Sequence, residues 1–272
     1  MVKIAICNEL FEGWDIGRIA SYVAELGYDA IEIAPFTIAH SVDEVSAERR
    51  KEIRSVVEDR GIEVAGLHWL LLSPPGLYIT HPEEEVRERT ASYLISLVDF
   101  CADLGGKVMV IGSPRQRDLM EGVSYSDGWR FAEEVFRKAV KAAEDRGVIL
   151  CLEPLHRSIT NFITTASEAV RMIDAIGSPS FKLILDVYSM GGEEMPRDEL
   201  IRTYSRYLAH VHINDDNKRE PGSGSVDFGP IMRALSEIGY EGYVSVEVLD
   251  LGYDDPREIA RRSIERIKAE MA

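Results

Sequence analysis

Three carboxylates and one imidazole stand at the ends of successive apolar segments. The segments VILCLE, FKLILD, AHVHI and YVSVE carry Glu153, Asp186, His212 and Glu247, which lie 33, 26 and 35 residues apart. Each interval is about the length of one strand-helix unit in a parallel α/β fold. Polar groups at the same point of successive units converge in space, and oxygen ligands with one imidazole suit a divalent cation. The pattern predicts a metal site, with Mn²⁺ as the expected ion and Mg²⁺, Co²⁺ or Zn²⁺ as alternatives.

A single carboxylate at a strand end has a simpler explanation, because it can accept hydrogen bonds from the next helix or remain solvated. That explanation weakens when four such groups occur together. Glu153 and Glu247 each end an otherwise apolar segment, and a buried charge is costly unless it is paired or coordinated. Their two strands are separated by two others, so in a closed barrel they face each other across the mouth.

The elements that must position these residues alternate along the whole chain between short β-rich segments and longer amphipathic ones. The earlier expected strands carry KIAIC, DAIEIA, IEVAGLHW and KVMVIG. The expected helices cover roughly 15–27, 43–60, 83–104, 128–146, 167–177, 197–206, 228–239 and 256–271. Eight strands in strict alternation with eight helices predict one α/β domain, a single (β/α)8 TIM barrel over residues 1–272. A doubly wound open sheet is the alternative.

Three of the connections that follow expected strands are long. They are SPPGLYITHP at 73–82, SPRQRDLMEGVSYSD at 113–127 and NDDNKREPGSGSVD at 214–227. The connections at the other end of the expected barrel, such as ELGYD and EDRGI, are short. Because barrel enzymes place their active sites on the strand-to-helix loops, we expect a covered cavity at the carboxyl ends of the strands.

Composition excludes several classes of partner. The chain has 272 residues, 47 acidic against 31 basic, and a formal net charge of −16, which argues against nucleic acid as a partner. No apolar run is long enough to span a membrane. The first residues lack the charged and apolar regions of a signal peptide, so we expect a cytoplasmic protein. Cys7, Cys101 and Cys151 lie inside apolar segments and are interpreted as buried, reduced thiols.

The segments LEPLHR, LDVYSM, HVHINDDN and VSVEV, in this alternation, resemble the xylose isomerase-like TIM barrel superfamily. Within it the chain is most similar to the ketose 3-epimerase and hydroxypyruvate isomerase-like group, also called sugar phosphate isomerases/epimerases. The resemblance covers essentially the whole chain, including GYDAIEI and GLHW. It implies that Glu153, Asp186, His212 and Glu247 bind one divalent metal ion, and that the protein forms a homo-oligomer, either a dimer or a tetramer.

The resemblance also implies a reaction. A metal that polarises a carbonyl and stabilises an enediolate makes the proton on the neighbouring carbon removable. Glu153 and Glu247, on opposite faces of this planar intermediate, are expected to abstract and return the proton as general base and general acid. Return to the opposite face of the same carbon gives epimerisation, and return to the neighbouring carbon gives isomerisation. The expected enzyme is a metal-dependent sugar isomerase or epimerase acting on a ketose or related keto-polyol.

Three positions depart from the usual ketose 3-epimerase pattern. Ile159 stands where that group has a glutamate, Ser189 where it has a histidine, and Lys218 where it has an arginine. All four metal positions match. The resemblance therefore supports the type of reaction, while the identity of the sugar, and whether it carries a phosphate, stay open.

Four further polar residues are expected to contact the substrate. His68, at the end of the third expected strand, could instead pack against Trp69. Lys218 and His156 could instead be exposed to solvent. Glu32 lies in the second expected strand.

Other activities are open on the same barrel. Loss of water from an enediolate with a hydroxyl at the β-carbon would make the protein a dehydratase of the inosose or dehydroshikimate type. The apurinic-site endonuclease branch of this barrel binds several zinc ions through many histidines. This chain has only six histidines, and Ser189 stands where that branch would need a zinc-binding histidine, so this activity is disfavoured. His210, two residues before His212, is interpreted as a core histidine. A non-catalytic sugar-binding protein would have a degraded metal set, and this set is complete.

Overall fold

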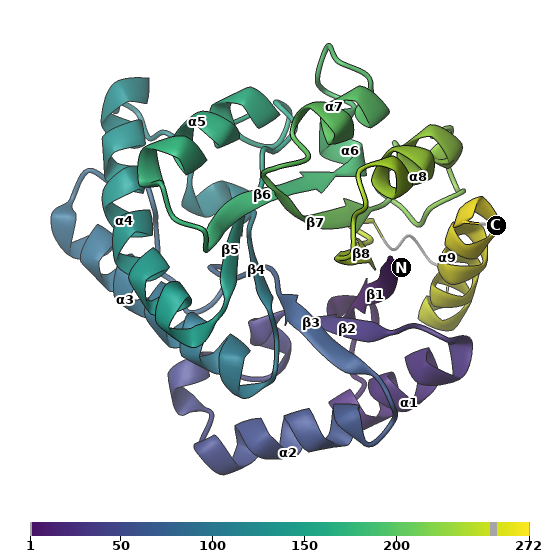
Figure 1. Cartoon of the computed structure of the whole chain (residues 1–272). Coiled ribbons are helices and arrows are strands. Elements are labelled where there is room, and N and C mark those ends of the chain that lie inside the picture. The colour runs from purple at the N-terminus through teal and green to yellow at the C-terminus, as the bar shows by residue number, and fades with distance from the viewer. Residues whose placement is uncertain (1, 251–254, 272) are drawn as a thin grey trace.

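Eight parallel strands close into a barrel in sequence order, and β1 is hydrogen-bonded to β8 (Figure 1). The computed structural model describes residues 2–250 and 255–271. The strands are β1 Lys3–Cys7, β2 Ala30–Ile33, β3 Glu63–Leu67, β4 Val108–Ile111, β5 Ile149–Leu152, β6 Phe181–Asp186, β7 Leu208–Ile213 and β8 Tyr243–Val246. Closure confirms the predicted (β/α)8 barrel and rules out the open sheet.

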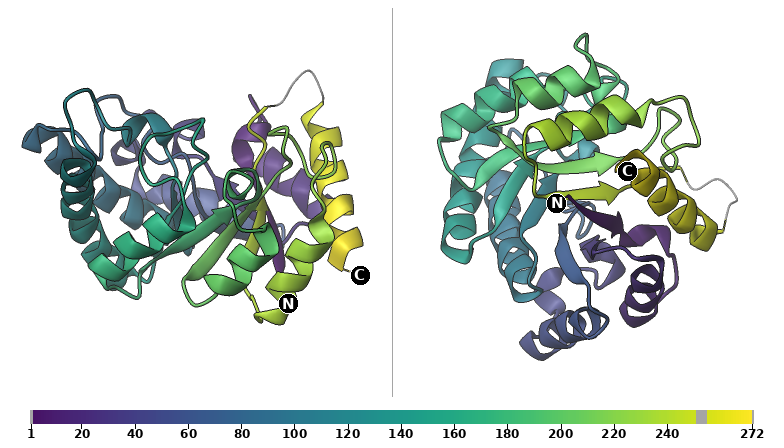
Figure 2. Two further views of the ribbon diagram at one scale, coloured as in Figure 1. Left: turned by 90° about the horizontal axis from the view of Figure 1, so that it is seen from above. Right: turned by 45° about the vertical axis from the view of Figure 1, so that its right-hand side comes forward.

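Helices form a ring around the barrel, as the views in Figure 2 show. Within the described residues the α-helices are α1 Ile16–Leu26, α2 Ala47–Glu58, α3 Glu84–Asp103, α4 Tyr125–Arg146, α5 Ala166–Ile176, α6 Val187–Met190, α7 Arg197–Thr203, α8 Phe228–Glu237 and α9 Pro256–Met271. The prediction of eight helices missed α6, a single turn that begins directly after β6.

The segment expected as one helix over 43–60 is divided. A short 3-10 turn, η3 (Val42–Glu44), precedes α2, which begins only at Ala47. Ser46 causes the break, because its Oγ accepts a hydrogen bond from the backbone N–H of Arg49 (3.2 Å) and so caps the helix there. The division leaves the order of the elements unchanged.

The interior of the barrel changes character along its axis. Residues two apart on a strand share a face, so Ala5 and Cys7 lie on the same side of β1. Ala5 and Ala30, which pair between β1 and β2, belong to a small buried apolar cluster. One step towards the carboxyl ends, Cys7 pairs with Glu32. The side chains in the interior are therefore small and apolar at one end of the barrel and polar at the other.

The long loops all leave the carboxyl ends of the strands, as predicted. They connect β3 to α3, β4 to α4 and β7 to α8, while the loops at the opposite rim are short. The three cysteines are buried and form no disulfide, which confirms their interpretation as core thiols. No helix in the described part of the chain is both long and apolar enough to cross a membrane.

Candidate metal centre and active site

The four predicted metal ligands meet at the carboxyl end of the barrel. Glu153 follows β5, Asp186 ends β6, His212 lies near the end of β7 and Glu247 follows β8. Each offers one ligand atom, and these atoms all lie within 4.8 Å of one another in a buried cluster. The strand register brings them together, because Asp186 pairs with His212 across β6 and β7. The side chains present fit the first shell of a divalent cation.

Neighbouring groups hold the Asp186 carboxylate in place. Its Oδ1 accepts a hydrogen bond from the backbone N–H of Ser189 (2.7 Å), and its Oδ2 accepts one from Asn214 Nδ2 (2.6 Å). The first contact is the N-cap of α6, so the unexpected helical turn serves to orient a ligand. Hydrogen bonds to ligating carboxylates typically fix metal geometry in this way.

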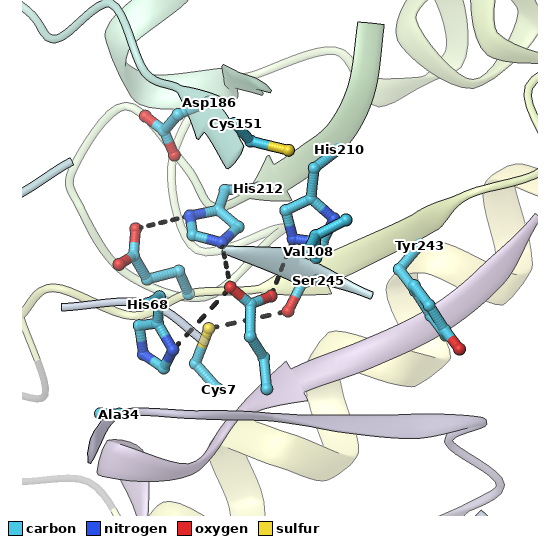
Figure 3. A network of polar contacts seen from close by, with 12 residues as sticks. Cys7, Ala34, His68, Val108, Cys151, Asp186, His210, His212, Tyr243 and Ser245 are labelled. Carbon is cyan, nitrogen blue, oxygen red and sulfur yellow. Dashed lines mark hydrogen bonds and ion pairs between the residues drawn. The ribbon is translucent and has the colours of Figure 1, made fainter. Parts of the chain in front are cut away.

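His212 is held between two carboxylates. Its Nδ1 lies 3.1 Å from Glu247 Oε2, inside the cluster, while its Nε2 lies 3.0 Å from Glu32 Oε1. Glu32 also contacts His210 Nε2 (2.8 Å), and Figure 3 shows the rings of His210 and His212 side by side. With Glu32 against Nε2, Nδ1 is the nitrogen of His212 that lies towards the cluster and would bind a metal.

The electrostatics of the cluster call for a cation. Burial, followed by the negative charges of Glu247 and Asp186, raises the pKa of Glu153 well above its ordinary value. Burial and then Glu247 raise the pKa of Asp186 to about 6. Burial also disfavours the charged form of Glu247, but His212 outweighs it and lowers its pKa. The raised pKa values of Glu153 and Asp186 reflect the repulsion between crowded carboxylates, which a bound divalent ion would relieve.

His68 reaches the cavity beside the cluster. It follows β3, is fully buried and lines the cavity together with Glu153 and Glu247. Its Nε2 lies 2.6 Å from Glu9 Oε2. Burial disfavours the imidazolium, but the charge and hydrogen bond of Glu9 outweigh it and raise the pKa of His68. The competing interpretation, a histidine that only packs against Trp69, does not account for its place on the cavity wall.

The other three expected substrate residues lie off the cavity wall. Glu32, 0% exposed, is hydrogen-bonded to two imidazoles and supports His212, and its contact with substrate stays a prediction. His156 is half-buried, with its ring 5.2 Å from that of Tyr188. Lys218 Nζ lies 5.1 Å from the centroid of the same ring. None of the three is among the described residues that line the cavity.

Two supporting residues escaped the sequence analysis. Glu9, which orients His68, follows β1, and Asn214, which orients Asp186, follows β7. The signal was present, because both are polar residues just beyond a strand end, the criterion that selected Glu153 and Glu247. Both follow segments, KIAIC and AHVHI, that the sequence had already marked as strands.

Known proteins share this architecture and are similar in sequence. A family model described as xylose isomerase-like TIM barrel matches residues 20–270. A D-psicose 3-epimerase of Agrobacterium fabrum is 31% identical over 235 residues, which are 85% of this chain and 78% of that protein. A 3-dehydro-D-guloside 4-epimerase of Escherichia coli is 27% identical over 274 residues, covering 97% and 98% of the two chains.

The fold comparison agrees with the sequence comparison. The crystal structure of a D-psicose 3-epimerase with D-tagatose from Clostridium cellulolyticum superposes with a TM-score of 0.87, covers 99% of both chains and is 23% identical. The family match spans nearly all of the barrel, and the relatives align over most of its length. The chain therefore belongs to the xylose isomerase-like TIM barrel family.

Proposed function

We propose that the protein is a divalent-metal-dependent sugar epimerase or isomerase that transfers a proton at a carbon next to a ketose carbonyl. The relatives named as epimerases support the class of enzyme. The observation that carries the proposal is the buried cluster of Glu153, Asp186, His212 and Glu247 on one cavity. The substrate expected there is a ketose or related keto-polyol.

The two glutamates divide the proton transfer. Glu153 and Glu247 come from β5 and β8, which β6 and β7 separate, and both line the cavity. A substrate held between them presents opposite faces to the two carboxylates. One carboxylate abstracts the proton as base and the other delivers a proton as acid, a division worth about 10²- to 10⁴-fold in rate. The face or carbon that receives the proton decides between epimerisation and isomerisation.

A metal ion bound to the tetrad would polarise the carbonyl and balance the charge that develops on its oxygen. Glu32 holds His212 by its outer nitrogen, and Asn214 and Ser189 hold Asp186, so these ligands are oriented before the ion arrives. Mn²⁺ is the proposed ion because oxygen ligands outnumber the single nitrogen. His68, fixed by Glu9, is the proposed partner for a substrate oxygen.

The test is deuterium incorporation in D₂O. The protein is stripped of metal, reloaded with Mn²⁺ and incubated with a panel of ketoses and inososes, and products are identified by NMR. Deuterium at a carbon next to the carbonyl, with formation of an epimer or isomer, is the expected result. Loss of water would reassign the protein as a dehydratase. If no compound exchanges deuterium although metal is bound, the proposal is refuted.

Substitutions connect the exchange to the two glutamates. Glu153→Gln and Glu247→Gln should each lower exchange about 10²-fold or more, since an amide cannot act as the base. Glu241→Gln, which changes an exposed carboxylate at the opposite rim, is the matched control and should retain full exchange. Retention of exchange in either active-site variant would refute the role assigned to that residue.

A further inference from the structure

The described residues that line the cavity beside the metal cluster fall into two chemical groups. The polar group comprises Glu153, Asp186, Glu247 and His68. The second group is a set of apolar side chains, here called the apolar wall. The apolar wall consists of Trp69, Val110, Pro114, Leu155, Ile159 and Leu249.

Apart from the indole N–H of Trp69, the remaining polar side-chain groups of the described lining are two serine hydroxyls, and both accept a hydrogen bond from the backbone. Ser113 Oγ accepts a hydrogen bond from the N–H of Leu71 (3.2 Å), and Ser189 Oγ accepts one from the N–H of His156 (3.3 Å). Neither serine belongs to the apolar wall. A substrate group placed against that wall therefore meets carbon everywhere except at the indole N–H of Trp69.

The apolar wall is built on unusual backbone. Trp69, Ile163 and Lys218 are the non-glycine residues of the described chain that have positive φ, at 52°, 55° and 65°. Bulky residues rarely adopt this left-handed conformation, which costs about 1–3 kcal/mol and persists where the surrounding structure imposes it, typically at functional sites. Trp69 is itself a wall residue.

The other two positive-φ residues hold wall residues through hydrogen bonds. Ile163 O accepts from the N–H of Leu155 (3.3 Å), and Lys218 O accepts from the N–H of Leu249 (3.0 Å). Three separate loops thus hold strained positions that present apolar groups to the same cavity. Lys218, expected to bind substrate with its side chain, contributes to this site through its carbonyl.

We propose that the natural substrate is a keto sugar that carries a methyl group where common ketoses carry a terminal hydroxymethyl group. This inference rests on the proposed function, because it places the carbonyl end of the sugar at the metal cluster. The opposite end then lies against the apolar wall. A hydroxyl there would be desolvated without a partner, at a cost of about 1–3 kcal/mol, whereas a methyl group gains from burial.

The test compares matched pairs of sugars. Fructose, psicose, tagatose and sorbose are each paired with the 6-deoxy sugar of the same configuration, in both enantiomeric series. Affinity for the Mn²⁺-loaded protein is measured by calorimetry, which is independent of turnover, and deuterium incorporation is measured alongside. In at least one pair the deoxy sugar should bind about 10- to 100-fold more tightly, the discrimination that an unpaired hydroxyl provides in an apolar site.

Two variants of one wall residue locate the effect. Ile159→Gln adds hydrogen-bonding groups of similar size, and should reduce the preference for the deoxy sugar about tenfold or more. Ile159→Leu keeps the wall apolar and should retain the preference. Both variants should bind Mn²⁺ like the unaltered protein, because residue 159 is not one of the four clustered ligands.

The outcomes separate this inference from the proposed function. If the hydroxylated member of every pair binds as tightly as its deoxy partner, or if no sugar binds, the inference is overturned. An equal change of preference in Ile159→Gln and Ile159→Leu would also overturn it. A deoxy sugar that binds selectively, with no deuterium incorporation from any pair, would support the inference about the wall and count against proton transfer as the function.

Discussion

At the scale of single residues, Glu32 organises the polar end of the barrel interior. Its two oxygens lie 2.8 Å from His210 Nε2 and 3.0 Å from His212 Nε2, and one lies 3.8 Å from His68 Nδ1. Burial disfavours its charge, but His210 and His212 outweigh burial and lower the pKa of Glu32 well below its ordinary value. A buried carboxylate that is hydrogen-bonded to two imidazoles fixes which nitrogen of His212 faces the metal cluster.

Replacement of this carboxylate should weaken metal binding. In Glu32→Gln the amide can also donate a proton, so His212 is no longer restricted to one tautomer, and Mn²⁺ affinity should fall about 10- to 100-fold. Isothermal titration of stripped protein measures the affinity. Glu193→Gln is the control, because this half-buried carboxylate accepts a hydrogen bond from Ala166 N–H (2.7 Å) and is not one of the clustered ligands. Equal affinities in both variants would contradict the role of Glu32.

The cysteines should be unreactive in the folded protein. Burial raises the pKa of Cys7, Cys101 and Cys151, so the thiolate, which is the reactive form, is scarce near pH 8, where an ordinary thiol of pKa about 8.5 reacts readily. Iodoacetamide should leave the native chain unmodified and should label all three thiols in guanidinium chloride, as read by mass spectrometry. Rapid labelling of any one of them in native protein would show that its site is open.

Prediction from the sequence succeeded at this scale where the signal lay in one segment. Glu153 and Glu247 were visible because a polar residue ends a short apolar run. The support of His212 by Glu32 was not visible, because it depends on β2 and β7 meeting across the barrel. The apolar wall was equally hidden, since Trp69, Ile159 and Leu249 come from three loops whose conformations no periodicity describes.

At the scale of elements, one glycine leaves room for a side chain of the metal cluster, and another leaves room for the backbone of a neighbouring strand. Gly112 follows β4, and a Cβ added there would overlap Glu153 Oε2, the end of a flexible side chain. Gly66 lies in β3, and a Cβ added there would overlap the backbone oxygen of Val108 on β4. β3 and β4 pair with each other at Gly66 and Val108.

The two alanine variants should therefore fail in different ways. Gly112→Ala should displace the Glu153 carboxylate and lower Mn²⁺ affinity and exchange about tenfold or more, with little change in the free energy of unfolding. Gly66→Ala should lower the free energy of unfolding by about 1–3 kcal/mol, because backbone has to move, while the folded fraction keeps its metal affinity. Denaturant unfolding and metal titration measure both quantities. The same defect in both variants would contradict this separation.

Element order was predictable, and element boundaries less so. Apolar runs of β-branched residues located all eight strands, since a parallel strand buried on both faces reads as a continuous run. Ser46 divided the helix expected over 43–60, and Asp186 started α6. In both cases the helix begins after a side chain that caps it by a hydrogen bond. Hydrophobic periodicity alone does not reveal such a cap, so the predicted boundary was wrong.

At the scale of the whole molecule, the two ends of the chain meet. β1 pairs with β8 through Ile6 and Val246, and Tyr28 Oη donates a hydrogen bond to Ala260 O on α9 (2.7 Å). A barrel closed in this way exposes no strand edge along its circumference. The prediction of one domain over residues 1–272, drawn from the alternation of strands and helices in the sequence, is open to a direct test.

The chain should unfold as a single unit. Tryptophan fluorescence, from Trp14, Trp69 and Trp129 in three different regions, and far-ultraviolet circular dichroism should give coincident transitions in denaturant. Saturating Mn²⁺ should move both midpoints upward together, because a ligand that binds only the folded state stabilises it. A plateau between two transitions would show that part of the barrel unfolds independently, and would contradict the single domain.

Deuterium incorporation into a ketose as a function of bound Mn²⁺ tests the central claim most directly. Stripped protein is titrated with Mn²⁺, and the exchange rate and the bound metal per chain are measured in the same samples, with the best substrate of the panel. The account predicts negligible exchange without metal, a rate that rises in proportion to bound Mn²⁺, and a plateau at about one ion per chain, since the four ligands form one site. Full exchange in the stripped protein would contradict it.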